Sequence, residues 1–236
     1  MLRYESLKQR PKRLLALTGL ARREFEELLP AFGQAYATRY PVVKQKRKRA
    51  AGGGRKATLQ TLEDQLLFIL VYQKAYPLQV VQAELFGFSQ SSANHWIHHL
   101  LPVLLDALAA LGVLPERDGE RLAHHERRQH EPRDLVIDGT ERRRQRPKNP
   151  EKQALHYSGK KKAHSDKNVV IVNTASKRVA FLSTTYAGKT HDKKVADQEQ
   201  VRYPRRCTLR QDTGFQGYQP RVARLCQPKK SRVVVN

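Results

Sequence analysis

The sequence has few cysteines and no long apolar segment, the features that stabilise small secreted folds and anchor chains in a bilayer. Its 236 residues include two cysteines, Cys207 and Cys226. Two isolated thiols make neither a disulfide framework nor a four-ligand zinc site, so we expect reduced cysteines. The longest apolar run, residues 66–72, is too short to cross a bilayer, and the first residues lack the apolar core of a signal peptide. We therefore expect no membrane partner.

Acidic residues are scarce beside basic ones. Forty-five Lys and Arg against 22 Asp and Glu give a formal net charge of +23. Self-repulsion of this size disfavours a compact state unless a polyanion neutralises it. Nucleic acid is the favoured partner, because contacts to phosphates release condensed counterions. An acidic membrane surface is a weaker alternative, since the chain has no amphipathic anchor, and a basic protein without a polyanionic partner is the third reading.

The first half of the chain has helical periodicity. Residues 14–36 predict one helix, and residues 39–56 predict a basic arm that includes Lys48 and ends in three glycines. Helical spacing returns at residue 58, where Thr61 and Asp64 are spaced as in a capping box. We therefore divide this half into residues 1–57 and a DNA-binding domain of residues 58–114.

That second segment has the order of a helix-turn-helix. Residues 78–86 predict a short helix, Gly87 a turn, and Ser89 the cap of a longer helix. A recognition helix contacts base edges with side chains near its N-terminus. Three residues of the longer helix carry polar groups suited to this role, namely Gln90, Ser91 and Asn94.

The second half changes to the pattern of strands. Residues 115–132 are polar and predict a linker before a domain of residues 133–236. The predicted strands are 134–140, 168–172, 179–185 and 208–212, with a helix over 191–200. Together with the first half, this pattern predicts an α+β protein.

Two carboxylates follow two of the predicted strands. Asp138 ends the first strand and Asp212 ends the fourth, each before a turn that contains glycine. Carboxylates that converge at one sheet edge can hold hard cations for phosphodiester chemistry. Capping of turns is the alternative role, because Asp is common after strands. The cations around them suit a phosphate backbone: Arg142, Arg143, Lys160, Lys161 and Lys162.

Four motifs in one order connect these residues to a known family. They are residues 136–141, 157–164, 188–194 and 212–218. In this order they resemble the DDE-superfamily transposases of bacterial insertion sequences, and residues 58–114 resemble the helix-turn-helix domain that often precedes the catalytic domain. The resemblance covers about residues 59–220.

The resemblance implies a ribonuclease-H-like mixed sheet in which Asp138 and Asp212 are catalytic and bind two Mg²⁺ or Mn²⁺ ions. The ions would activate water, and later a DNA 3′-hydroxyl, and stabilise the leaving oxygen. His191 and Asp192 match a Gly-x-x-His-Asp motif and are expected to support the site. The implied partners are double-stranded DNA, both terminal inverted repeats and target, and further copies of the chain in a cytoplasmic, nucleoid-associated complex of a bacterium.

One departure from the family concerns the third carboxylate, a Glu expected well beyond the second Asp. The sequence after Asp212 contains no Asp or Glu. We therefore expect an incomplete catalytic domain that is inactive alone, either completed by a frameshift-encoded C-terminal half or truncated. A non-catalytic DNA-binding fragment that competes for element ends is the second hypothesis. A domesticated nuclease is the third, and it would need Glu141 or Asp192 as the third acid.

Overall fold

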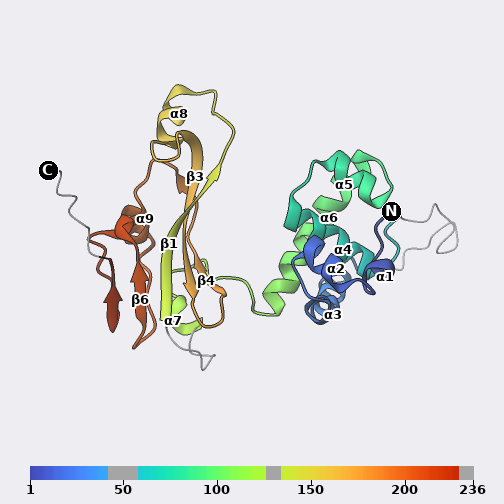
Figure 1. Ribbon diagram of the computed structural model, residues 1–236, viewed down its shortest axis with the longest axis horizontal. Helices are drawn as coiled ribbons and strands as arrows, with labels where there is room; N and C mark the ends of the chain where they lie inside the picture. The colour runs from blue at the N-terminus through green and yellow to red at the C-terminus, as the bar shows by residue number, and fades with distance from the viewer. Residues whose placement is uncertain (42–57, 126–133, 229–236) are drawn as a thin grey trace. The chain divides into compact units, whose positions relative to one another are not determined.

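The computed structural model describes residues 1–41, 58–125 and 134–228. The chain divides into two compact units, Met1–Val113 and Leu114–Asn236 (Figure 1). Each unit has its own hydrophobic core. The first unit is helical and the second contains a mixed sheet, so the predicted α+β class is confirmed. The predicted basic arm with Lys48 lies outside the described residues. No helix in the described ranges is long and apolar enough to cross a membrane.

The helical unit is built around one buried helix. Its helices are α1 (Tyr4–Leu7), α2 (Pro11–Thr18), α3 (Arg22–Arg39), α4 (Leu62–Ala75), α5 (Gln79–Phe86) and α6 (Gln90–Ala110). Residues 64–71 of α4 are all buried, and α4 packs against α2, α3 and α6. Phe25 and Phe32 of α3 lie in the same core cluster as Phe68 of α4. The core is therefore continuous across the boundary that the sequence placed between residues 57 and 58.

The predicted single helix over residues 14–36 is wrong. The helix breaks at Gly19, which has φ +77° and whose N–H is bonded to the Leu15 carbonyl at 2.8 Å. The Thr18 hydroxyl donates to the Leu14 carbonyl and accepts from the Leu20 N–H. A left-handed glycine therefore ends α2, and the chain restarts in a new direction as α3.

The predicted helix starts of the helix-turn-helix are confirmed. The Thr61 hydroxyl accepts from the Asp64 N–H at 3.1 Å, and Ser89 Oγ accepts from the Ser92 N–H at 3.3 Å. Gly87 adopts the left-handed conformation, φ +73°, between α5 and α6. The Asp64 carboxylate does not complete a capping box, because it accepts from the Tyr4 N–H and pairs with Arg3.

The second unit contains a mixed sheet. Its elements are α7 (Leu122–His125), β1 (Asp134–Arg143), α8 (Pro150–His156), β2 (Tyr157–Ser158), β3 (Ala163–Asn173), β4 (Val179–Leu182), β5 (Tyr186–Ala187), α9 (Asp192–Glu199), β6 (Thr208–Gln211), the 3₁₀ turn η2 (Thr213–Phe215) and β7 (Arg224–Cys226). The strand order is β2-β3-β1-β6-β7, and β4 and β5 also pair with β3. Strand β1 is antiparallel to β3 and parallel to β6.

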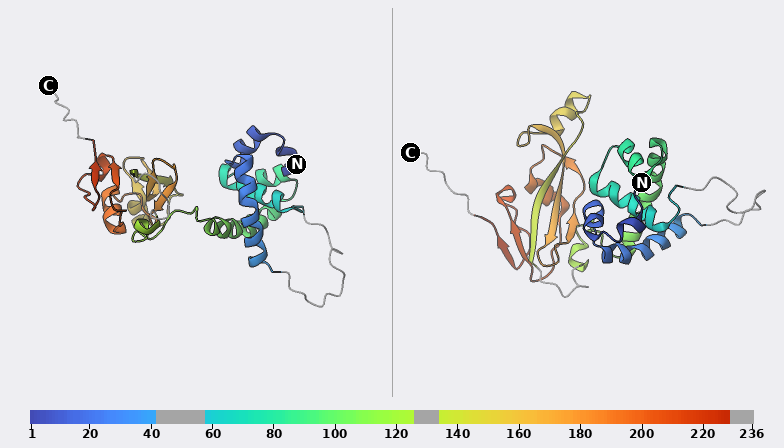
Figure 2. Two further views of the ribbon diagram at one scale, coloured as in Figure 1. Left: turned by 90° about the horizontal axis from the view of Figure 1, so that it is seen from below. Right: turned by 45° about the vertical axis from the view of Figure 1, so that its right-hand side comes forward.

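The long β1–β3 pair extends past the rest of the sheet toward α8 (Figure 2). Leu135 and Ile137 of β1 and Val169 and Ile171 of β3 are buried, so β-branched and aliphatic residues with a period of two form the inner layer. Helix α9 packs against β3 and η2. This packing brings the start of α9 close to the region where β6 ends.

Sequence reasoning underestimated the strands that pair over long separations. Strand β1 reaches Arg143 and β3 begins at Ala163, while the predicted strand over 179–185 ends at Leu182. The described part of the predicted linker also belongs to the second unit. The Glu116 N–H donates to the Ala180 carbonyl and the Leu182 N–H donates to the Glu116 carbonyl. The linker residue in these bonds, Glu116, pairs through its backbone only, so the polar composition of the segment suggested a solvated linker.

Candidate active site at the edge of β1 and β6

The two predicted catalytic carboxylates lie on neighbouring strands. The parallel pairing of β1 with β6 ends at Ile137 and Gln211, and Asp138 and Asp212 directly follow these two residues in the chain. Neighbouring strands lie about 4.8 Å apart, so these two backbones are adjacent. Ile137 and Gln211 are buried, whereas both aspartates are exposed. Asp138 is within β1 and not at its end, because β3 continues to pair with β1 beyond it.

Backbone amides fix both carboxylates. The Gly139 N–H donates to Asp138 Oδ1 at 2.7 Å, and the Gly214 N–H donates to Asp212 Oδ1 at 2.9 Å. Asp212 is also the N-cap of η2. Each carboxylate therefore has one oxygen held by the backbone and is presented to solvent in a defined orientation. We call Asp138, Asp212 and their glycines the acid edge.

Asp192 lies against the acid edge. A methyl group added to Gly139 would come within 2.5 Å of Asp192 Oδ1, and one added to Gly214 within 3.0 Å of Asp192 Oδ2. Only glycine leaves room for the carboxylate at Gly139. His191, the other supporting residue expected from the sequence, is exposed and forms no side-chain cap bond at the start of α9. The structure thus brings Asp192 to the predicted pair and leaves His191 in solvent.

A buried lysine connects Asp192 to the sheet. Lys167 Nζ lies 2.9 Å from Asp192 Oδ1 and 3.4 Å from Glu141 Oε1. Lys167 and Glu141 are direct partners in the β1–β3 pairing, and the side chains of both are 8% exposed. Lysine is almost never buried without a charged partner. The Lys167 ammonium therefore serves two carboxylates, and sequence reasoning missed it because the contact depends on strand register.

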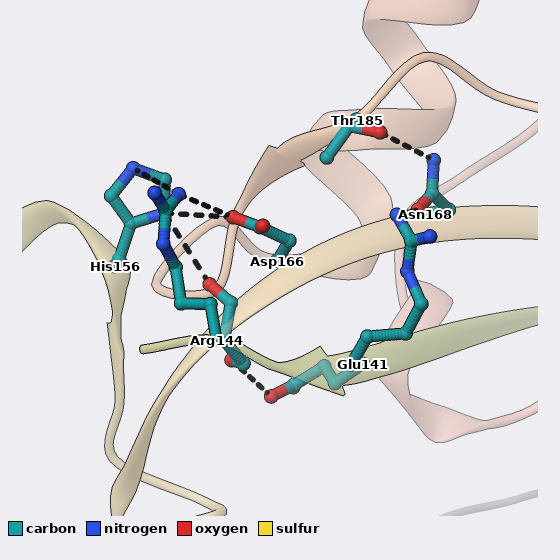
Figure 3. Close-up of polar contacts among 8 residues, drawn as sticks. Glu141, Arg144, His156, Asp166, Asn168 and Thr185 are labelled. Carbon is teal, nitrogen blue, oxygen red and sulfur yellow. Dashed lines mark hydrogen bonds and ion pairs between the residues drawn. The ribbon is translucent and has the colours of Figure 1, made fainter. Parts of the chain in front are cut away.

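Glu141 is held in its charged form. Ser165 Oγ donates to Glu141 Oε2 at 2.9 Å (Figure 3). Burial alone would raise the pKa of Glu141, but hydrogen bonds with Ser158 and Ser165 and the ammonium of Lys167 bring the pKa below its ordinary value. Glu141 is therefore a structural anion beneath the acid edge.

The donor set at the acid edge fits a hard divalent cation only in part. Two exposed carboxylates are suitable oxygen ligands for Mg²⁺ or Mn²⁺, which keep water and phosphate oxygens in their other positions. Across residues 1–41, 58–125 and 134–228, no three His, Cys, Asp or Glu side chains are arranged to hold a metal ion. The acid edge thus offers two ligands, and Asp192 lies beside them in contact with Lys167.

The predicted base-reading residues differ in availability. Gln90 and Ser91 are exposed in the first turn of α6, and Ser91 Oγ lies 3.0 Å from Ser89 Oγ. Asn94 is half-buried, and its amide donates to Gln79 Oε1 of α5 at 3.3 Å. Asn94 therefore connects the two helices of the helix-turn-helix as well as lying near its surface.

The predicted phosphate-binding cations surround the extended β1–β3 pair. Lys160, Lys161 and Lys162 are exposed in the turn between β2 and β3, and Arg143 is exposed at the end of β1. Arg142 is partly committed elsewhere, because its guanidinium donates to Asn168 Oδ1 at 2.9 Å. Asn168 in turn donates to Thr185 Oγ1, so Arg142 helps to fasten the loop after β4 (Figure 3).

Comparison with known proteins identifies both units. A family model described as DDE superfamily endonuclease matches residues 137–231, which contain the acid edge and Asp192. A second, described as the helix-turn-helix of DDE superfamily endonuclease, matches residues 57–110, which contain α4, α5 and α6. No curated protein and no solved structure matches the chain. Along the chain, the helix-turn-helix match precedes the endonuclease match. The chain therefore belongs to the DDE superfamily of endonucleases as a DDE-type transposase.

Proposed function

We propose that this chain is the transposase of a bacterial insertion sequence, which binds the ends of its element and catalyses metal-dependent DNA cleavage and strand transfer. The observation that carries the proposal is that Asp138 and Asp212 directly follow Ile137 and Gln211, the last paired residues of the β1–β6 ladder. The strand order β2-β3-β1-β6-β7, with β1 antiparallel to β3 and parallel to β6, supports a ribonuclease-H-like domain.

In this proposal the chain supplies a rigid pair of metal-binding carboxylates. Bound there, one or two Mg²⁺ or Mn²⁺ ions would make a water or 3′-hydroxyl oxygen nucleophilic and neutralise the leaving oxygen. Asp138 and Asp212 hold their orientation through the N–H groups of Gly139 and Gly214. Preorganised ligands lose little freedom when the substrate arrives, which is the main contribution a scaffold makes to such chemistry.

Asp192 is a positioning residue in this scheme. Its carboxylate fills the space beside Gly139 and Gly214, and the Lys167 ammonium keeps it there. The negative charge of Asp192 adds to the attraction of the acid edge for cations, whereas Lys167 limits the mutual repulsion of the carboxylates before a metal binds. His191, exposed at the start of α9, would contact DNA in this scheme and would not bind the metal.

DNA binding is divided between the two units. Gln90 and Ser91 of α6, together with Asn94, would contact base edges of the terminal inverted repeat, since a recognition helix uses its first turns for this purpose. Arg142, Arg143, Lys48 and the lysines 160–162 would contact phosphates, which gives affinity without sequence preference. Further copies of the chain would hold the two ends together.

Strand-transfer activity of the 236 residues alone should be low. The sequence from Thr213 to Asn236 contains no Asp or Glu, so water must occupy positions that a third carboxylate would take. The same observation favours a second candidate function, in which the chain occupies element ends without cutting them and so limits transposition. A C-terminal segment that supplies a glutamate, for example from an alternative reading frame, should raise cleavage above the level of this chain.

Mn²⁺ binding and DNA nicking test the proposed site together. Binding is measured by electron paramagnetic resonance of free Mn²⁺, and nicking with a supercoiled plasmid that carries candidate ends. Asp138→Asn and Asp212→Asn should each weaken Mn²⁺ binding at least tenfold and remove any nicking. Asp197→Asn is the matched control, because Asp197 is an exposed carboxylate of α9 paired with Lys193. Equal losses in Asp138→Asn and Asp197→Asn would show that the acid edge is not the metal site.

A further inference from the structure

A pocket separate from the acid edge lies where α8 meets the start of β3. Its volume is about 550 Å³, and its lining includes Arg146, Gln153, Tyr157, Gly159, His164 and Lys189. This volume lies within the range of small-ligand sites, about 300–1,000 Å³. Among the described lining residues there is no Asp or Glu. The pocket therefore combines a usable size with uncompensated positive charge.

The two cations of the pocket are available to an anion. The Nε and Nη2 groups of Arg146 donate to Gln153 Oε1 at 3.0 and 2.8 Å, which fixes the guanidinium and leaves its Nη1 group to donate to a ligand. Lys189 is exposed and forms no ion pair within the described residues. A held guanidinium beside a lysine ammonium is a suitable receptor for a phosphate group.

The pocket also presents an aromatic face. Tyr157 is 44% exposed although it is a large hydrophobic side chain. Its ring meets the ring of His164 edge-on, with centroids 5.5 Å apart, and the two residues are partners in the β2–β3 pairing. The edge contact with His164 fixes the tyrosine ring. A fixed aromatic ring beside cations is the arrangement that binds unpaired bases by stacking.

The framework around the pocket is rigid. The Arg144 guanidinium and the His156 ring both contact Asp166 Oδ1, at 2.8 and 3.0 Å, and so fasten the end of α8 to β3 (Figure 3). The loop that carries Lys189 is seated equally closely, because a methyl group added to Gly188 would come within 2.1 Å of Ser165 Oγ. The walls of the pocket are therefore positioned before any ligand binds.

The pocket lies close to the acid edge. Lys189 and Asp192 are three residues apart, so their Cα atoms are separated by at most about 11 Å. Along β3, His164 is six residues from Val170, the partner of Asp138, which is about 20 Å. At 3.4 Å for each nucleotide step of duplex DNA, these limits correspond to about three to six steps. One DNA strand can reach both places.

We propose that this pocket binds one unpaired nucleotide of the DNA strand that passes the acid edge. Tyr157 stacks on its base, and Arg146 and Lys189 hold its phosphate. The inference rests on the proposed function for the identity of the strand, but it predicts a binding property that the acid edge alone does not provide. It gives the chain a preference for DNA with an unpaired segment, whether or not the acid edge holds metal.

Binding to single-stranded DNA tests the pocket without cleavage. The full chain in EDTA is titrated with an octanucleotide that contains one 2-aminopurine, and separately with a duplex of the same sequence. The wild type should quench the 2-aminopurine fluorescence by stacking. Tyr157→Ala should abolish the quenching and weaken single-strand binding about tenfold, with unchanged duplex affinity. Tyr157→Phe should retain the wild-type behaviour, since the ring and not the hydroxyl makes the contact.

Charge variants separate the pocket from general electrostatic attraction. Lys189→Ala should weaken the octanucleotide more than the duplex. Arg178→Ala removes an equal charge at the exposed turn between β3 and β4 and should leave quenching intact. Unaltered quenching in Tyr157→Ala, with the melting curve of the wild type, would overturn the inference. Tyr157-dependent quenching in a chain that binds no Mn²⁺ would support the pocket and count against the proposed catalytic function instead.

Discussion

The two units bury polar groups in different ways. In the helical unit the buried polar side chains serve helix ends and helix contacts: Thr18 bonds to its own helix, and Gln82 of α5 donates to the Phe68 carbonyl of α4. The buried Asp64 likewise accepts from the Tyr4 N–H at the start of α1. In the sheet unit, four of the seven described buried polar residues lie within β3, and one of the four, Lys167, is charged. The helical unit therefore uses polarity to complete backbone structure, whereas the sheet unit uses it beside the acid edge.

This difference has an energetic consequence. A buried ion pair is often no more stable than a well-packed apolar pair, but loss of one partner leaves an uncompensated charge. The Glu141–Lys167–Asp192 cluster thus adds little to the stability of the folded state, but loss of any one of its charges should destabilise the sheet unit strongly. In the helical unit the corresponding sensitivity lies in packing, since Leu66 and Phe68 are fully buried. Removal of a charge from the sheet unit can therefore be compared with formation of a cavity in the helical unit.

Lys167→Met should have the largest effect. It leaves Glu141 and Asp192, whose side chains are 8% and 20% exposed, without their cation, and the sheet unit should lose about 3–5 kcal/mol of unfolding free energy. Trp96, the only tryptophan, lies in the helical unit, so its fluorescence reports the unfolding of that unit and should give an unchanged transition. Circular dichroism reports both units, and the transition of the sheet unit should move to a lower denaturant concentration. A shift in the tryptophan transition would mean that the units are not energetically separate.

Leu66→Ala should reverse that pattern. The substitution opens a cavity in α4 and should cost the helical unit about 3 kcal/mol. The tryptophan transition should move and the transition of the sheet unit should stay. Leu105→Ala on α6 is a suitable control, because the Leu105 side chain is exposed and its truncation should change stability little.

Glu141→Gln should destabilise the sheet unit by about 1.5–3 kcal/mol at pH 7, the value of hydrogen bonds to a charged group. The folded pKa of Glu141 is lowered, so its contribution is fully present above the unfolded pKa of about 4.3 and is lost as pH falls through the folded pKa. The unfolding free energies of the wild type and the variant should therefore converge as the pH falls from 5 through the folded pKa of Glu141. A constant difference over that interval would contradict the assignment.

Ser89→Ala should have the smallest effect, about 1 kcal/mol, because it removes the hydroxyl that accepts from the Ser92 N–H at the start of α6. Ser89→Asp should restore the loss, since aspartate is also a good N-cap. Amide exchange in the first turn of α6 is the sensitive measurement, as fraying is confined to that turn. Exchange rates that do not change would show that Ser89 does not cap α6.

The features that the sequence predicts are local ones. Thr61, Gly87 and Ser89 mark helix ends through atoms within three residues. Asp138 and Asp212 follow residues 135–137 and 208–211, two short segments whose strand pattern is visible in the sequence itself. The extension of β1 to Arg143, and with it the pairing of Glu141 with Lys167, depends on β3, more than 20 residues away. Asp192 was expected near the site only from its motif, and its place between two glycines requires three distant segments to be folded first.

The loop from Gly188 to Asp192 is held at both ends. Gly188 has no room for a side chain beside Ser165, and Asp192 begins α9 with its carboxylate against Gly139. Three residues span this interval, and neither end can move to absorb a fourth. The length of this loop is therefore constrained as strongly as the identity of Gly188 and Asp192. An insertion that other surface loops would tolerate should displace Asp192 from the acid edge.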